Sequence, residues 1–126
     1  MTRVLICDDD DMIGEALHDV LTAEPDLAVV AVARTAVEAI ELAERHSPDV
    51  VVLDVRMPGG GGIHVARELR ERSPTTRVVV FSAYTDPKTV TEMRRAGVTE
   101  YLVKGVPNTD IVDTVRRLGR GPVGKL

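Results

Sequence analysis

The sequence predicts an α/β fold in which a parallel five-stranded sheet carries helices on both faces. Five short apolar runs alternate with segments of helical periodicity, and four of these runs are rich in valine or isoleucine. Most of the runs lack the apolar–polar alternation of a half-exposed strand, which indicates strands buried on both faces. Regular alternation of strand and helix is typical of a doubly wound sheet with right-handed crossovers.

The predicted strands are VLIC at 4–7, LAVVAV at 27–32, VVVL at 50–53, VVVF at 78–81 and YLV at 101–103. Between and after them, apolar or small residues recur at the three-to-four spacing of an amphipathic helix. The helical positions are Ile13, Ala16, Leu17, Val20 and Leu21; Ala36, Ala39, Ile40 and Ala43; Ile63, Ala66 and Leu69; Val90, Met93 and Gly97; Ile111, Val115 and Leu118.

Capping residues place the helix boundaries. Thr35 followed by Glu38 is a capping-box pattern that opens the second helix, and Asp86 with Pro87 forms an N-cap and first-turn pair for the fourth. Ser-Pro pairs at 47–48 and 73–74 follow the second and third helices, where proline would stop them. Gly97 can end the fourth helix.

Length and composition indicate one ordinary globular domain. The chain has 126 residues, of which 44% are hydrophobic and 29% charged, with a net charge of −4 and only 2% aromatic residues. This balance argues against contact with nucleic acid or an anionic membrane. The longest apolar run, 27–33, is too short to span a bilayer, and no targeting segment is evident, so we expect the protein in the cytoplasm.

Charged and polar side chains gather where the predicted strands end. They are Asp8 and Asp9 after the first strand, Asp54 after the third, Ser82 at the end of the fourth and Lys104 after the fifth. Ligands of doubly wound sheets bind at this edge. Two carboxylates about 4 Å apart repel by roughly 4 kcal/mol at an effective dielectric of about 20, so a cluster of them holds either protons or a hard cation. An all-oxygen site suits Mg²⁺, and with Lys104 it could neutralise a phosphoryl group in transit.

Two neighbouring features have simpler interpretations. Asp10 and Asp11 are typical of helix N-capping and dipole complementation. The glycine run at 59–62 lacks the Gly-Lys-Ser/Thr of a P-loop and does not fit a dinucleotide-binding fingerprint. We interpret it as a flexible turn into the third helix.

Four segments together resemble the CheY-like receiver domains of bacterial two-component response regulators. They are RVLICDD at 3–9, LDVRMP at 53–58, VFSA at 80–83 and YLVK at 101–104. The resemblance extends from residue 2 to residue 118 and implies a flavodoxin-like (βα)5 three-layer sandwich with strand order 2-1-3-4-5. Gly105 stands where the family usually has proline, which resembles the subfamily with a LuxR-type helix-turn-helix output.

The resemblance implies a role for each residue at the strand ends. Asp54 would accept a phosphoryl group from the phosphohistidine of a sensor histidine kinase. Asp9 and Asp54 would bind Mg²⁺ directly, Asp8 through water, and Arg56 through its main-chain carbonyl.

The remaining roles concern the phosphoryl oxygens and the switch. Lys104 and Ser82 would bind those oxygens, and Tyr101 would turn from outside to inside as the loop of Ser82 moves. The family's acyl phosphate hydrolyses on the domain itself, so we expect a switch that promotes its own phosphorylation and dephosphorylation and is not an enzyme for a separate substrate. Arg56 and Tyr84 flank the pocket and are expected to tune the decay.

The domain boundaries and partners follow from the same resemblance. We expect a receiver domain at 1–119 and a linker or tail at 120–126, cut from a larger protein that binds DNA through a C-terminal output domain. Phosphorylation could drive homodimerisation, through helices one and five or through the face of helix four, strand five and helix five.

Two other functions fit parts of the pattern. A magnesium-dependent phosphohydrolase on a similar sheet would need an acid–base aspartate two residues after its nucleophile, where this chain has Arg56. A phosphorylation-independent pseudo-receiver would normally lack the acid pair, the acceptor or the lysine, all of which are present.

Overall fold

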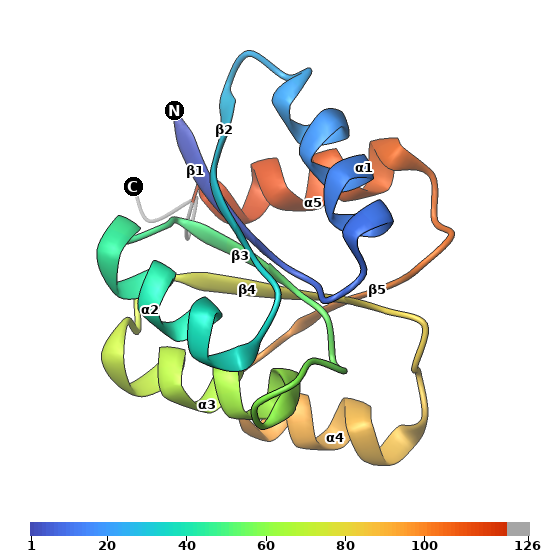
Figure 1. Ribbon diagram of the computed structural model, residues 1–126. Helices are drawn as coiled ribbons and strands as arrows, with labels where there is room; N and C mark the ends of the chain where they lie inside the picture. Colours follow the sequence, from blue (N-terminus) through green and yellow to red (C-terminus); the bar gives the residue numbers. More distant parts are fainter. Residues whose placement is uncertain (121–126) are drawn as a thin grey trace, which may run out of the picture.

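The computed structural model describes residues 1–120, in which strands and helices alternate along the chain (Figure 1). The strands are β1 (Thr2–Cys7), β2 (Leu27–Ala33), β3 (Val50–Leu53), β4 (Arg77–Ser82) and β5 (Glu100–Val103). The helices are α1 (Asp11–Thr22), α2 (Ala36–His46), α3 (Gly61–Arg72), α4 (Pro87–Arg95) and α5 (Asn108–Gly119). Of the predicted tail at 120–126, all but residue 120 lies outside the described residues.

The strands form one parallel sheet in the order β2-β1-β3-β4-β5. The chain first moves from β1 to the edge strand β2 and then returns to place β3 on the other side of β1. This reversal is the topological switch of a doubly wound sheet, and the carboxyl ends of β1 and β3 lie beside it. The predicted fold class and strand order are therefore confirmed.

Both faces of the sheet are covered. In Figure 1, α1 and α5 lie together on one face, while α2, α3 and α4 lie on the other. Val4 and Ile6 of β1 belong to the core cluster under α1 and α5, whereas Leu5 and Cys7 belong to the cluster under the other three helices. Successive strand residues point to opposite faces, so a strand covered on both sides must be apolar throughout.

The strands extend slightly beyond the apolar runs that predicted them. β1 begins at Thr2 rather than Val4, and β4 runs from Arg77 to Ser82 rather than from 78 to 81. Thr2 pairs with Leu27, and Arg77 pairs with Val50. The main-chain ladder does not depend on side-chain polarity, so it continues where the apolar pattern has ended.

The predicted helix caps are present with one difference. The Thr35 hydroxyl accepts a hydrogen bond from the Glu38 N–H (3.1 Å), and the Asp86 carboxylate accepts from the Thr89 N–H (3.1 Å). The Glu38 carboxylate accepts from the N–H of Arg34 (2.9 Å), one residue before the cap. Glu38 thus fixes the chain between β2 and α2 as well as the first turn of the helix.

An arginine of α5 holds the loop between α1 and β2. Arg116 donates to both carboxylate oxygens of Asp26 at 2.7 and 2.9 Å, and to Glu24 at 2.7 Å. The hydrogen bonds from Arg116 are the main reason that the pKa of Asp26 is lowered to about 2. This contact joins parts of the chain that are far apart in sequence.

Candidate functional site

Main-chain hydrogen bonds between neighbouring strands bring the predicted site residues to one edge of the sheet. Asp54 N–H donates to the carbonyl of Cys7 (2.9 Å), and Lys104 N–H donates to the carbonyl of Ser82 (3.0 Å). Asp8 N–H donates to the carbonyl of Ala33 at the end of β2 (2.9 Å). The parallel ladders therefore place these residues side by side at the carboxyl edge of the sheet.

Three carboxylates meet at this edge. One carboxylate oxygen each of Asp8, Asp9 and Asp54 lies within 4.8 Å of the others. Asp8 and Asp54 are only 2% and 5% exposed, while Asp9 is exposed to solvent. Burial, followed by repulsion from Asp8, raises the pKa of Asp54, against the smaller opposing effect of Lys104. The site therefore concentrates negative charge where water screens it poorly.

Lys104 bridges the two buried carboxylates. Its Nζ lies 3.0 Å from Asp8 Oδ2 and 3.4 Å from Asp54 Oδ2. Burial acts to lower the pKa of Lys104, but its contacts with Asp8 and Asp54 outweigh burial and raise the pKa. The ammonium group therefore stays charged and offsets part of the repulsion between the two acids.

The two oxygens of Asp8 have different surroundings. Oδ1 accepts a hydrogen bond from the Asp10 N–H (2.9 Å), which fixes the orientation of the carboxylate. Oδ2 is buried and accepts no hydrogen bond of good geometry within residues 1–120, although Lys104 is near. The ammonium group of Lys104, 3.0 Å from this buried oxygen, therefore supplies the charge that offsets its burial.

The other two acids of the N-terminal run lie at the start of α1, as predicted. Asp10 is the N-cap residue, and its carboxylate accepts from the N–H groups of Met12 (2.9 Å) and Ile13 (3.3 Å). Asp11 is the first helical residue, is exposed, and forms an ion pair with Arg34. These two acids therefore belong to the start of the helix and not to the three-carboxylate cluster.

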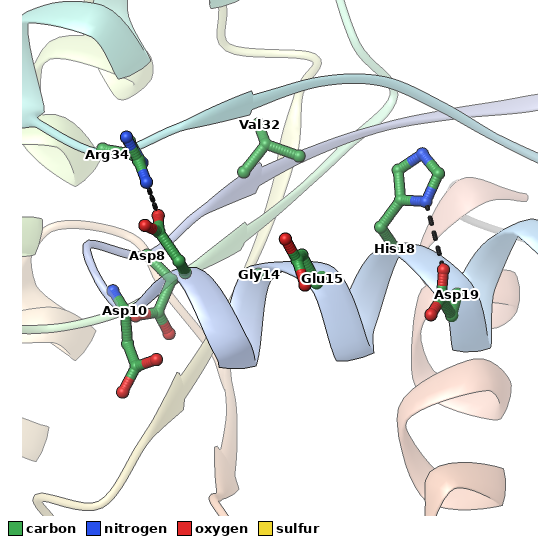
Figure 2. Close-up of a pocket in the computed structure, with 9 residues that line it drawn as sticks. Asp8, Asp10, Gly14, Glu15, His18, Asp19, Val32 and Arg34 are labelled. Atoms are coloured by element: carbon green, nitrogen blue, oxygen red, sulfur yellow. Dashed lines mark hydrogen bonds and ion pairs between the residues drawn. The ribbon is translucent and has the colours of Figure 1, made fainter.

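An acidic groove extends outward from this site along α1. Figure 2 shows it between α1 and the end of β2, with Asp8 and Asp10 at one end and Asp19 further along the helix. Glu15 lies between them, and Arg34 lies on the β2 side. The groove therefore places further acidic side chains beside the three-carboxylate site, with Arg34 and His18 as the basic residues of its lining.

The last residue of the glycine run, Gly62, lies against the main chain of Asp54. Gly59, Gly60 and Gly61 have φ values of 89°, 116° and 76°, which only glycine adopts readily, and α3 begins at Gly61. A Cβ on Gly62 would lie 2.3 Å from the carbonyl oxygen of Asp54. The turn is predictable from the glycine run, but this close approach is not, because no local pattern distinguishes the fourth glycine from the other three.

Tyr84, in the loop after β4, links Ser82 to Tyr101 by hydrogen bonds. Ser82 is fully buried, and its hydroxyl accepts from the N–H of Tyr84 (3.1 Å). Tyr101 packs partly buried against the core, and its hydroxyl donates to the carbonyl of Tyr84. Burial, and then the charges of Asp86 and Asp54, raise the pKa of Tyr101.

The two predicted flanking residues touch each other. The Arg56 guanidinium lies over the ring of Tyr84, with its central carbon 3.8 Å from the ring centroid. Arg56 comes from the loop after β3 and Tyr84 from the loop after β4, so the contact joins the two loops beside Asp54. The resemblance to the family predicts that both residues flank the pocket, but it does not predict that they stack.

No helix in residues 1–120 is long and apolar enough to cross a membrane.

Residues 4–116 match the response regulator receiver domain family. DevR/DosR, a DNA-binding transcriptional activator of Mycobacterium tuberculosis, is 35% identical over 96% of this chain, which spans 56% of that protein's length.

Solved structures agree with this match. The signal receiver domain of the putative response regulator NarL from M. tuberculosis is 34% identical with a TM-score of 0.90, covering 95% of this chain and 97% of that one. A LuxR-family response regulator from Aurantimonas is 29% identical with a TM-score of 0.88, covering 96% of this chain and 87% of that one. The chain belongs to the response regulator receiver domain family, and its relatives include transcriptional regulators of the LuxR and NarL type.

Proposed function

We propose that this domain is a phosphorylation-controlled switch in which Asp54 accepts a phosphoryl group from a sensor histidine kinase. The observation that carries the proposal is the pairing of Asp54 with a second buried carboxylate, Asp8, and with Lys104 between them. A carboxylate oxygen of Asp54 attacks the phosphorus, the bond from phosphorus to the kinase histidine breaks, and the imidazole keeps the electron pair of that bond. The product is an aspartyl phosphate.

The residues at the site fit a Mg²⁺ ion. All the candidate donors are oxygens, which Mg²⁺ prefers, and three carboxylates meet beside one ammonium group, that of Lys104. Asp9 and Asp54 would hold the ion directly, Asp8 through water, and Arg56 through its carbonyl. When bound, the ion supplies charge neutralisation at the phosphoryl oxygens.

Lys104 and Ser82 then distinguish the phosphorylated state. Phosphorylation adds nearly two negative charges and three acceptor oxygens at Asp54. The ammonium group of Lys104 is already 3.4 Å from Asp54 and pairs with one phosphoryl oxygen. The Ser82 hydroxyl binds another phosphoryl oxygen and draws in the loop that carries Tyr84, to whose carbonyl Tyr101 donates. Phosphorylation therefore shifts the conformational equilibrium of that loop.

The phosphoryl group leaves by hydrolysis on the domain itself, which limits the signal. Arg56 and Tyr84, stacked between the loops beside Asp54, tune the access of water and hence the lifetime. Replacing either by alanine should change the decay rate of the phosphorylated form. Equal lifetimes in the wild type and both variants would remove this role.

The wider protein is proposed from the relatives. The receiver domain occupies 1–119, the residues from 120 onward lead to a DNA-binding output domain, and the protein acts in the cytoplasm. Phosphorylation drives homodimerisation, through α1 and α5 or through the face of α4, β5 and α5. The length of DevR/DosR beyond the matched region supports a second domain.

The alternatives find less support. Arg56, at the position where a phosphohydrolase would carry its acid–base aspartate, is exposed and stacks on Tyr84. A pseudo-receiver would not need Asp8, Asp54 and Lys104 to meet, and they do meet.

The deciding experiment is intact mass after incubation with acetyl phosphate, with and without Mg²⁺. The wild type should gain one phosphoryl group only when Mg²⁺ is present, and Asp54→Asn should gain none. Asp10→Asn is the matched control because asparagine also caps helices, and it should gain the adduct. A folded wild-type protein that gains no adduct from acetyl phosphate or from a histidine kinase would instead favour the pseudo-receiver.

A further inference from the structure

Tyr84 makes three contacts that join the loop after Asp54, the end of β4 and β5. Its N–H donates to Ser82 Oγ (3.1 Å), and its carbonyl accepts from the Tyr101 hydroxyl. Its ring lies under the guanidinium of Arg56, 3.8 Å from centroid to central carbon. One residue therefore contacts the hydroxyl and the aromatic of the proposed switch, together with the loop that follows the acceptor.

The charge of Arg56 also acts on Asp86 in the loop after β4. Asp86, the N-cap of α4, has a lowered pKa, chiefly through hydrogen bonds from the N–H and hydroxyl of Thr89 and, to a smaller extent, through the nearby charge of Arg56. The Arg56 side chain is exposed and forms no ion pair of 4 Å or less within residues 1–120. Its contacts with this loop are therefore stacking on Tyr84 and attraction to Asp86.

We infer that Arg56 is a positioning residue for the switch: by stacking on Tyr84 it holds the carbonyl to which Tyr101 binds. The two hydrogen bonds are made by the main chain of Tyr84 and the stack by its side chain, so the three contacts are linked through one residue. When the stack is lost, the Tyr84 carbonyl is less well fixed, and the Tyr101 hydroxyl loses its acceptor for a larger fraction of the time. The effect of Arg56 on the Tyr101 hydrogen bond rests on the contacts alone. Its effect on signalling rests on the proposed function of Ser82 and Tyr101 as a switch.

The expected size of the shift in the Tyr101 equilibrium follows from the strength of the cation–π contact. An exposed cation–π contact corresponds to a change of about two- to fivefold in an equilibrium. Removing the Arg56 side chain should shift the ratio of bound to released Tyr101 by that factor, toward release. The partly buried ring of Tyr101 should then be more exposed to solvent on average.

The composition of the chain makes this measurable. It has two tyrosines and no tryptophan, so Tyr84→Phe leaves Tyr101 as the sole tyrosine. Phenylalanine keeps the ring under Arg56 and keeps the main-chain carbonyl. The ring signals of ¹³C-labelled tyrosine in nuclear magnetic resonance, with acrylamide quenching of tyrosine fluorescence, then report on Tyr101 alone.

The comparison is made in unphosphorylated protein between Tyr84→Phe and the double variant Tyr84→Phe/Arg56→Ala. The double variant should show displaced ring signals and stronger quenching. Arg56→Lys in the Tyr84→Phe background should show smaller changes, because lysine can also stack. Arg67→Ala is the matched control, since Arg67 is an exposed arginine of α3 without a hydrogen bond or ion pair in the described residues. It should leave the signals of Tyr101 in place.

Unchanged signals in the double variant would overturn the inference. An equal change in the Arg67→Ala control would overturn it too, because the effect would then be one of net charge. Acetyl phosphate with Mg²⁺ tests the proposed function separately. If the Tyr84→Phe protein gains the adduct but the ring signals of Tyr101 do not change, the proposed switch is wrong. The coupling between Arg56 and Tyr101 is tested independently of that result, because it is measured before phosphorylation.

Discussion

The ammonium group of Lys104 lies 3.4 Å from the carboxylate of Asp54. The two residues end different strands and are separated along the sheet by β4 and its terminal residue Ser82. The contact places a fixed positive charge beside the proposed acceptor before any phosphoryl group arrives. Preorganised charge of this kind lowers the barrier to a reaction because it does not have to reorient as charge develops.

Lys104→Met should therefore reduce phosphorylation of Asp54 while preserving the fold, because methionine has a similar length and no charge. We expect the initial rate of adduct formation with acetyl phosphate and Mg²⁺ to fall on the order of 100-fold, the effect of removing one preorganised donor. Intact mass against time measures this rate. Lys88→Met, an exposed position in the first turn of α4, should match the wild type, and an active Lys104→Met would refute the assigned role.

The raised pKa of Asp54 predicts a dependence of stability on pH and on Mg²⁺. Because the folded state holds the Asp54 proton more tightly than the unfolded chain does, folding loses stability as the pH rises above 3.8, the usual value of this carboxyl. Asp54→Asn should thus be more stable than the wild type at pH 7 without Mg²⁺, in urea unfolding.

Mg²⁺ should stabilise the wild type more than the variant and so reduce the difference. At a free concentration about ten times Kd, binding adds about 1.4 kcal/mol to the stability of the wild type. The variant lacks one carboxylate ligand and should gain much less. Equal stabilisation of both proteins would indicate that Asp54 does not contribute to the metal site.

The Arg116–Asp26 contact predicts a loss of stability in acid. The folded-state pKa of Asp26, about 2, lies below its usual value of 3.8, so its contribution is fully present above that value and disappears as the pH falls toward 2. Asp26→Asn should lower the urea midpoint at pH 7, and its difference from the wild type should shrink between pH 4 and pH 2. Glu71→Gln is the control, since Glu71 is an exposed acid of α3 without a hydrogen bond or ion pair in the described residues, and it should leave the urea midpoint at pH 7 close to that of the wild type.

Gly62→Ala should damage both stability and the acceptor, because the new Cβ would lie 2.3 Å from the carbonyl oxygen of Asp54. We expect a cost of about 1–3 kcal/mol in urea unfolding, typical of overpacking, and slower adduct formation. Gly14→Ala is the control, since Gly14 lies in α1 and its Cβ would lie 3.5 Å from Val32 of β2, an ordinary van der Waals distance. That variant should be neutral or more stable by up to about 1 kcal/mol.

Local sequence patterns predicted much of this molecule because they act over a few residues. Thr35 and Asp86 cap the helices that they were predicted to open, and the apolar runs became the strands. The boundaries were less predictable: the ladder carries β1 back to Thr2, beyond its apolar run.

The gathering of Asp8, Asp54 and Lys104 was also predictable from sequence, because parallel strands put all their carboxyl ends at one edge. The sequence by itself thus determined the fold class, the strand order through its resemblance to a family, and the set of residues at that edge. Each of these depends on local periodicity or on a rule of sheet topology.

Only the tertiary structure decided which side chains touch. The stacking of Arg56 on Tyr84, the approach of Gly62 to Asp54, and the ion pair of Arg116 with Asp26 depend on how loops and helices pack from distant parts of the chain. No local pattern encodes such a contact, because its geometry is set by the elements that carry the two residues and not by the residues alone.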